Sequence, residues 1–241
     1  MISVKGLKKS YGDVEALKDV SFEFDRGETV ALLGGNGSGK STSINIMAGL
    51  LAPDSGAVDV QGVDPFKSPN EARKKIGVFP DKPGLFPNLT VREHFRFFGG
   101  LHGLDGHALD DAVDKTIAML GIEDLAERIT KGFSQGQTVK VALGRAVVHS
   151  PDYLILDEPS RGLDIYAVRQ LREMLMTFRS AGTGILFSSH VMQEVEILAD
   201  RLVIIADGVV CAQGQPDALK EQAGTNSLED AFMVHVERMA S

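Results

Sequence analysis

Cysteine is nearly absent from this sequence. Cys211 is the only one among 241 residues, so no internal disulfide can form. That scarcity is typical of proteins that work in a reducing compartment. Cys211 lies within the apolar run VVCAQG, and we therefore expect a small buried side chain there rather than a reactive thiol.

The sequence also lacks an excess of basic residues. It carries 25 Lys and Arg against 33 Asp and Glu, which gives a formal charge of -8. No block of basic residues stands out from this acidic background. The balance weighs against a general nucleic-acid-binding protein, and we expect no nucleic-acid partner.

Long hydrophobic runs are missing as well. The longest apolar stretches, such as LVIIA and ILF, are far shorter than the roughly 20 residues that a membrane-spanning helix needs. The N-terminus, MISVKGLKKSYG, has neither the apolar segment nor the cleavage site of a signal peptide. We therefore expect a chain that does not cross a membrane and that reaches one only through a partner.

The hydrophobic residues that are present predict an α/β protein. They make up 43% of the chain, enough for one large core. Phe22 and Phe24 alternate with acidic residues, which predicts a strand. DRGE then suggests a hairpin turn, TVALLG a strand buried on both faces, and the segment from Lys40 to about Gly49 a helix.

The middle of the chain is helical in pattern, and strand–helix alternation returns after Pro151. Thr90 and Glu93 have the spacing of a capping box at the start of one helix. The later rhythm implies a mostly parallel sheet covered by helices. We predict one domain over residues 1–225, with a helical subdomain at about 86–150 inserted in the core, and a short helical tail over residues 226–241.

A glycine-rich loop follows the TVALL strand and matches the pattern G-x-x-x-x-G-K-[ST] in full. Its glycines let successive N–H groups face phosphate oxygens, and the following helix adds its positive end. Lys40 can bridge the β- and γ-phosphates, and the Ser41 hydroxyl can ligate Mg²⁺. A chance glycine loop is the alternative, but the complete motif between a strand and a helix favours nucleotide binding. The loop residues are Gly34, Gly35, Asn36, Gly37, Ser38, Gly39, Lys40, Ser41 and Thr42.

A second strand, LIL, ends abruptly in two acids, Asp157 and Glu158. Ligands in such folds lie beyond the carboxyl ends of the strands. Asp157 is then placed to hold Mg²⁺, and Glu158 to act as general base or to position the attacking water. Alone, the motif is also compatible with a solvated acidic turn before Pro159. The phosphate loop upstream favours the functional interpretation.

A third motif, Phe133-Ser134-Gln135-Gly136-Gln137, stands at the start of an expected helix. Its hydroxyl and backbone N–H groups can face an anion. With the phosphate loop and the LDE segment in this order, residues 2–215 closely resemble the nucleotide-binding subunits of ABC transporters. The resemblance implies the P-loop NTPase fold of that family, with antiparallel N-terminal strands beside a mostly parallel core sheet.

The resemblance also implies roles for individual residues. Tyr11 matches the aromatic residue that stacks on adenine, and His190 the switch histidine that contacts the γ-phosphate. Asp164 matches the residue that couples two sites. Ser134, Gly136 and Gln137 match the signature motif, which reaches the ATP held by a second subunit in a head-to-tail dimer. Alone, Tyr11 is more often an ordinary turn aromatic, and His190 is compatible with a helix-capping or semi-buried histidine.

Two departures from the family pattern stand out. Phe133 and Gln135 replace the usual leucine and glycine of the signature, while Ser134 and Gly136, which carry the phosphate contacts, remain. Asp81 stands where the family has a glutamine that senses Mg²⁺ and nucleophilic water. We therefore expect Asp81 near the metal. The segment around it and the adjoining helices are expected to form the groove that receives the permease.

These features together resemble the ATPases of ABC-2 type exporters, with the greatest likeness to those of bacterial sodium-extruding pumps. The resemblance implies a homodimeric motor at the cytoplasmic face of the cell membrane, bound to a separate permease. Export of drugs, lipids or polysaccharides by the same machinery is an alternative. A soluble ABC ATPase of cofactor assembly is another. A translation factor of this family usually has two cassettes, and a non-hydrolysing sensor is disfavoured by Glu158 and His190.

Overall fold

A single sheet runs through the molecule in the computed structural model, which describes residues 1–240 and the side chains of residues 1–239. Within these residues it has nine strands in the order β4-β1-β2-β9-β8-β3-β7-β6-β5. The strands are β1 (Ile2–Tyr11), β2 (Val14–Phe24), β3 (Thr29–Leu33), β4 (Ser55–Val60), β5 (Ile76–Phe79), β6 (Tyr153–Leu156), β7 (Gly184–Ser189), β8 (Arg201–Ala206) and β9 (Val209–Gly214).

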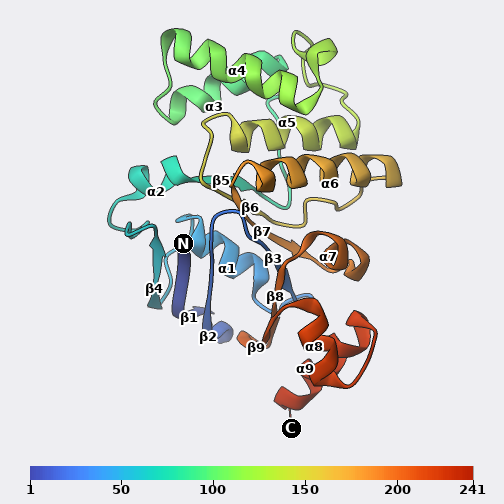
Figure 1. The fold of residues 1–241 in the computed structure, drawn as a ribbon. Helices are drawn as coiled ribbons and strands as arrows, with labels where there is room; N and C mark the ends of the chain where they lie inside the picture. The colour runs from blue at the N-terminus through green and yellow to red at the C-terminus, as the bar shows by residue number, and fades with distance from the viewer. Residues whose placement is uncertain (241) are drawn as a thin grey trace.

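Helices cover the sheet and extend beyond it at one end (Figure 1). They are α1 (Lys40–Met47), α2 (Pro69–Lys75), α3 (Val91–Leu101), α4 (Gly106–Leu120), the 3-10 turn η1 (Glu123–Leu125), α5 (Gln135–Val147), α6 (Ile165–Ser180), α7 (Met192–Leu198), α8 (Pro216–Ala223) and α9 (Leu228–Ala240). Helices α3 to α5 lie together at one end, and α8 and α9 lie at the other.

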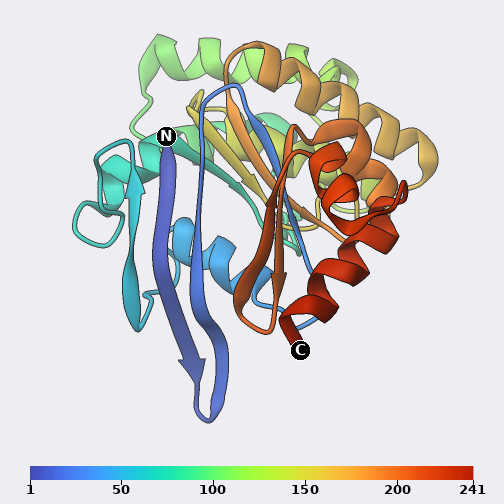
Figure 2. The same ribbon diagram turned by 60° about the horizontal axis from the view of Figure 1, so that its bottom comes forward.

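The central strands are buried on both faces, and each face belongs to a different hydrophobic cluster. In β3, Ala31 and Leu33 join the cluster that includes α3 to α6, whereas Val30 and Leu32 join the cluster beneath the N-terminal strands. The alternation follows from the two-residue period of a strand. Helix α1 contributes Ile44 to the second cluster and lies between the N-terminal strands and the core strands (Figure 2).

Strands β3, β5, β6 and β7 are parallel, so their carboxyl ends meet at one edge. Leu33, the last residue of β3, pairs with Ser189, the last of β7. Phe79 at the end of β5 likewise pairs with Leu156 at the end of β6. The phosphate loop, Asp157, Asp81 and His190 follow these four ends, and this edge is therefore where a ligand is expected in such sheets.

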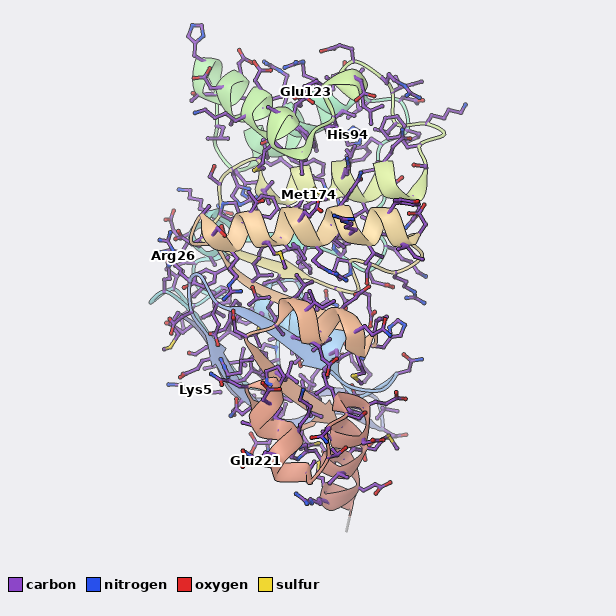
Figure 3. The ribbon with its side chains drawn as sticks, turned by 45° about the vertical axis from the view of Figure 1, so that its right-hand side comes forward. Lys5, Arg26, His94, Glu123, Met174 and Glu221 are labelled. Carbon is purple, nitrogen blue, oxygen red and sulfur yellow. The ribbon has the colours of Figure 1, made fainter. Side chains whose placement is uncertain are left out.

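The helical layer is positioned by local signals that the sequence contains. Thr90 and Ser134 each form a complete capping box, with Glu93 and Gln137 respectively, and so fix where α3 and α5 begin. Gly144 allows α5 to approach α3, because a Cβ there would lie 2.2 Å from Cζ of Phe95. Figure 3 shows this layer, carrying His94 and Glu123, stacked above Met174 on α6.

Most predicted strands and helices are confirmed, with two corrections and several omissions. DRGE is a turn between β2 and β3, but these strands do not pair with each other, so it is not a hairpin. Cys211 is only half-buried, because it lies in the partly covered strand β9. Five further elements were not predicted from the sequence: β4, β5, β9, α2 and α8.

The turn between β8 and β9 joins three parts of the molecule. The Gly208 carbonyl accepts a hydrogen bond from the N–H of Lys18 in β2 at 2.8 Å, and the Gly208 N–H donates to the carbonyl of Ser38 in the phosphate loop at 3.1 Å. Its φ of 77° is left-handed, and a Cβ there would lie 2.9 Å from the carbonyl oxygen of Ala16. Glycine is therefore required at this position.

The C-terminal segment forms a helix, as expected. Helix α9 contributes Ala231 and Val236 to packing against the rest of the chain, and the imidazole Nε2 of the buried His235 lies 3.1 Å from the carbonyl oxygen of Leu219 in α8. None of the helices within residues 1–240 combines the length and the hydrophobicity needed to span a membrane.

Two histidines stack where α3 and α5 end, and they make stability depend on pH. The rings of His102 and His149 are parallel, with centroids 3.5 Å apart. Burial, and then the neighbouring His102, lower the pKa of His149 from 6.5 to about 4. Because the unfolded chain binds this proton more readily, stability is lost as pH falls from 6.5 towards 4.

For wild type, we expect this loss to reach about 3 kcal/mol between pH 6.5 and pH 4. In His149→Gln the loss should be clearly smaller, because the buried titrating group is gone. Urea unfolding at pH 6.5 and pH 4 measures the difference. The exposed His107 provides the control, His107→Gln, which should keep the wild-type dependence. Equal pH dependence in wild type and His149→Gln would contradict the prediction.

Candidate nucleotide site

The phosphate loop links β3 to α1 and has the tight backbone that its glycines predict. Gly39 caps α1 with a φ of 110°. A Cβ at Gly34 would lie 2.4 Å from the carbonyl oxygen of Ile205. Residues with larger side chains are therefore excluded at both positions, which is the physical reason for the glycine pattern.

The inner surface of this loop presents unused donors. No side chain forms a capping hydrogen bond at the start of α1. The Ser38 hydroxyl is buried without a hydrogen-bond partner among the residues that the structure describes. Lys40 is only 7% exposed, and its Nζ donates to the carbonyl oxygens of Gly34 at 2.8 Å and Gly35 at 3.0 Å. A helix N-terminus with orphaned donors and a buried cation fits phosphate.

Lys40 is electrostatically coupled to the two carboxylates after β6. Burial lowers the pKa of Lys40, whereas the charges of Glu158 and then Asp157 act to raise it. The cation of the loop and the two acids therefore occupy one site, although they are far apart in sequence. This convergence follows from the pairing of both β3 and β6 with β7.

Ser188, which was not predicted from the sequence, holds the Asp157 carboxylate and the backbone of Glu158. Asp157 is 5% exposed and accepts a hydrogen bond from the Ser188 hydroxyl at 2.6 Å. The same hydroxyl accepts from the N–H of Glu158 at 2.8 Å. Glu158 has a φ of 49°, a left-handed conformation that is uncommon for this residue type. Ser188 directly precedes Ser189 and His190, so its place in the SSH sequence was the feature from which its role in the site could have been predicted.

His190 and Glu158 are in direct contact. Nδ1 of His190 lies 2.8 Å from Oε2 of Glu158. The Glu158 side chain is 14% exposed, whereas that of His190 is 63% exposed. The carboxylate is thus inside the site and the imidazole at its mouth.

Glu194 in α7 is a second residue that was not predicted from the sequence, and it contacts Ser189, the residue before His190. Its carboxylate is buried and accepts hydrogen bonds from the hydroxyls of Ser160 at 2.6 Å and Ser189 at 3.4 Å. Glu194 therefore joins the loop after Glu158 to the residue that precedes His190. A buried acid on one face of a short helix is visible in sequence only once that helix has been placed.

Asp81 lies at the same edge, but its carboxylate has a protein partner. Arg161 Nη1 donates to Asp81 Oδ1 at 2.7 Å. Hydrogen bonding and charge from Asp81 raise the pKa of Arg161. The expectation that Asp81 contacts the metal or its water stays a prediction.

The remaining expected site residues form no hydrogen bond to the phosphate loop within the part of the chain that the structure describes. Tyr11 ends β1 and is 51% exposed. Ser134 caps α5, and with Gly136 and Gln137 it lines a cavity of about 480 Å³ that Asp164 also lines. Among residues 1–239, no hydrogen bond joins Ser134 to the phosphate loop.

The oxygen atoms at the sheet edge suit Mg²⁺. Ser41 is exposed in the first turn of α1 and offers its hydroxyl oxygen, and Asp157 supplies a carboxylate. Within the described residues, no group of three or more His, Cys, Asp or Glu side chains could hold a metal ion. A Mg²⁺ ion held here must therefore complete its coordination with water or phosphate oxygens, as this ion commonly does.

Comparisons with known proteins agree with this geometry. The family described as "ABC transporter" matches residues 17–161. The ABC transporter ATP-binding protein NatA of Bacillus subtilis is 37% identical, over 97% of this chain and 97% of its own length. The linearmycin resistance ATP-binding protein LnrL of the same organism is 32% identical, over 100% of this chain and 80% of its own length.

Solved structures give the same result. The chain is similar to an ATP-binding subunit of an ABC transporter, with a TM-score of 0.89 and 33% identity over 98% of this chain and 99% of that one. It is also similar to a dimeric post-hydrolysis state of the ATP-binding cassette MJ0796 bound to ADP and Pi, with a TM-score of 0.80 and 25% identity over 89% of this chain and 98% of that one. The chain therefore belongs to the ABC transporter family, as an ATP-binding subunit that hydrolyses ATP with Mg²⁺ as the partner of the nucleotide.

Proposed function

We propose that this chain is the motor subunit of an ABC-2 type exporter, acting as a homodimer on a separate permease at the cytoplasmic face of the membrane. The observation that carries the proposal is the convergence of Lys40, Asp157, Glu158 and His190 at one sheet edge. The likeness to NatA along nearly the whole of both chains supports the transporter assignment.

The roles of the site residues follow from their positions. Residues 34–42 surround the phosphates, and Tyr11, exposed at the end of β1, stacks on the adenine. The Ser41 hydroxyl and the Asp157 carboxylate would hold Mg²⁺; the sequence predicts Asp81 as a further contact, and its carboxylate is hydrogen-bonded to Arg161. When bound, Mg²⁺ neutralises charge on the phosphate oxygens. Lys40 adds a positive charge at the same phosphates.

Glu158 is placed to act on the attacking water. Its carboxylate accepts or orients the proton of that water, and His190 on the same carboxylate contacts the γ-phosphate. Ser134, Gly136 and Gln137 complete the site of a second copy, since they lie at a helix N-terminus and the Ser134 hydroxyl makes its hydrogen bond to Gln137 rather than to this chain's own phosphate loop. Asp164, beside them at the same cavity, lies where two copies would meet.

The permease surface is formed by the segment after β5 together with α3. We assign these helices to a subdomain at about 86–150 within one domain over residues 1–225, followed by the tail at 226–241. Phe86, Phe97 and Leu101 are exposed by 48%, 48% and 67%. The rings of Phe86 and Phe97 pack edge to face at 5.7 Å. Exposed apolar clusters of this kind mark interaction sites.

Replacing Phe97 with aspartate should abolish co-purification with a co-expressed permease, because a charge is introduced into this apolar surface. ATP hydrolysis by the isolated subunit should stay within about twofold of wild type. Met176 on α6 is exposed to a similar degree, 42%, and Met176→Asp is the matched control. Retention of the permease by Phe97→Asp would place the docking surface elsewhere. Failure of wild type to bind any membrane partner would favour a soluble ATPase of cofactor assembly.

For the cargo we follow the resemblance seen in the sequence and assign sodium ions. The name of LnrL makes drug export the second candidate, and lipid or polysaccharide export would use the same machinery. Membrane vesicles containing the permease and this subunit should move ²²Na⁺ on addition of ATP, and vesicles with Glu158→Gln should not. ATP-dependent transport of a drug without sodium movement would reverse the assignment.

A further inference from the structure

The loop that follows Glu158 is held by side-chain contacts to two other segments of the chain. In one contact the Ser160 hydroxyl donates to the buried carboxylate of Glu194. In the other Arg161 pairs with Asp81, which lies two residues beyond the end of β5. The Arg161 N–H also donates to the carbonyl of Glu158 at 3.1 Å. The backbone of Arg161 therefore helps to close the turn in which Glu158 adopts its left-handed conformation.

The charges at this edge explain why Asp81 needs a partner. Asp157 and Glu158 already place two negative charges here, and both act on Lys40 and on Arg161. A third carboxylate would repel them unless a cation accompanied it. Asp81 is the source of the largest effect on Arg161, whereas the charges that act on Lys40 are those of Glu158 and Asp157. Asp157 and Glu158 thus act on both cations, but only Arg161 also has the Asp81 carboxylate as a hydrogen-bonded partner.

We propose that Arg161 is a positioning residue that ties the Glu158 turn to the segment after β5 through Asp81, so that the Asp81 carboxylate serves this link rather than Mg²⁺. The inference rests on the proposed function, since the same segment continues to Phe86 at the surface assigned to the permease. A change at that surface then reaches Glu158 through one ion pair and one short turn.

A double-mutant cycle with Asp81→Asn and Arg161→Gln tests the link. We expect each single variant to lower kcat by about three- to tenfold, with the KM for ATP within twofold of wild type. The double variant should be no slower than the slower single variant, because one interaction is lost in all three. Additive losses would overturn the proposal. Thermal unfolding verifies that all four proteins are folded to the same extent.

The chain offers a matched control on α6. Arg169 and Glu173 form an exposed ion pair at 3.1 Å, and no hydrogen bond or ion pair among the described residues joins it to a site residue. The cycle with Arg169→Gln and Glu173→Gln should leave kcat unchanged in every member, as exposed pairs contribute little. An equal loss in this control cycle would show that any exposed pair affects kcat, and it would overturn the specific role of Arg161.

Metal binding provides a readout without turnover. Mn²⁺ binding is followed by electron paramagnetic resonance in the presence of ADP. If Asp81 serves Arg161, both single variants should bind Mn²⁺ within about twofold of wild type. A loss of tenfold or more in Asp81→Asn, with no loss in Arg161→Gln, would make Asp81 a metal contact and overturn the link. These measurements need no permease, so their failure is distinct from failure of the permease to bind.

Discussion

Replacing Glu158 with glutamine is expected to lower kcat for ATP hydrolysis by at least about a hundredfold, the usual size of a general-base contribution. ATP binding and ATP-dependent dimer formation should persist. The reason is geometric, because the amide keeps the shape of the side chain that contacts His190 but accepts a proton poorly. The backbone N–H of Glu158, which donates to Ser188, is unaffected by the change.

Phosphate release at saturating ATP measures hydrolysis, and sedimentation with and without ATP measures the oligomeric state. Glu173→Gln makes the same chemical change on the solvent side of α6, where the side chain is 62% exposed, and should leave both unchanged. Hydrolysis by Glu158→Gln at the wild-type rate would show that another group handles the proton. A variant that neither hydrolyses nor dimerises would instead indicate damage to the fold of the site.

Replacing Lys40 with alanine is expected to weaken ATP binding by about ten- to a hundredfold, in contrast to the change at Glu158. Hydrogen bonds to a charged group contribute about 1.5–3 kcal/mol each, and this cation is the one nearest the phosphates in the proposed site. Its loss also removes the two hydrogen bonds that Nζ donates to the carbonyls of Gly34 and Gly35. ATP-dependent dimerisation should disappear because ATP no longer occupies the loop.

Calorimetric titration with ATP in the absence of Mg²⁺ isolates this contribution from that of the metal. Lys74→Ala removes a lysine that is 58% exposed and lies away from the site, and it should bind ATP as wild type does. Equal ATP affinities for Lys40→Ala and wild type would refute the role of Lys40. Thermal unfolding of Lys40→Ala shows whether the buried Asp157 tolerates the loss of the neighbouring cation.

Elements set by local signals could be predicted from sequence. The TVALL strand is apolar throughout and is buried on both faces of the sheet. Thr90 with Glu93 has the spacing of a capping box, and the structure contains it. The phosphate loop combines glycine positions with a lysine and a serine, so its conformation and its chemistry were both predictable.

Elements set by distant contacts could not be predicted. Strand β5 has four residues and depends on pairing with β6, which lies more than seventy residues later in the chain. DRGE has the composition of a hairpin turn, yet the strand that follows it, β3, pairs with β7 and β8 instead of β2. β3 is apolar throughout, which favours a place in the middle of the sheet, where helices or other strands cover both of its faces. The contacts of Ser188, Glu194 and Arg161 arise only where three strand ends meet.

The turn at Gly208 makes the two parts of the sheet mechanically dependent on each other. β2 and β9 share a single register pair, Asp19 with Val209, so their ladder alone is a weak seam. Gly208 spans that seam, with its carbonyl bound to β2 and its N–H bound to Ser38 in the phosphate loop. A displacement of the antiparallel strands therefore has a direct backbone route, through Gly208, to the phosphate loop. The position of β2 relative to the core strands and the conformation of the phosphate loop are therefore linked.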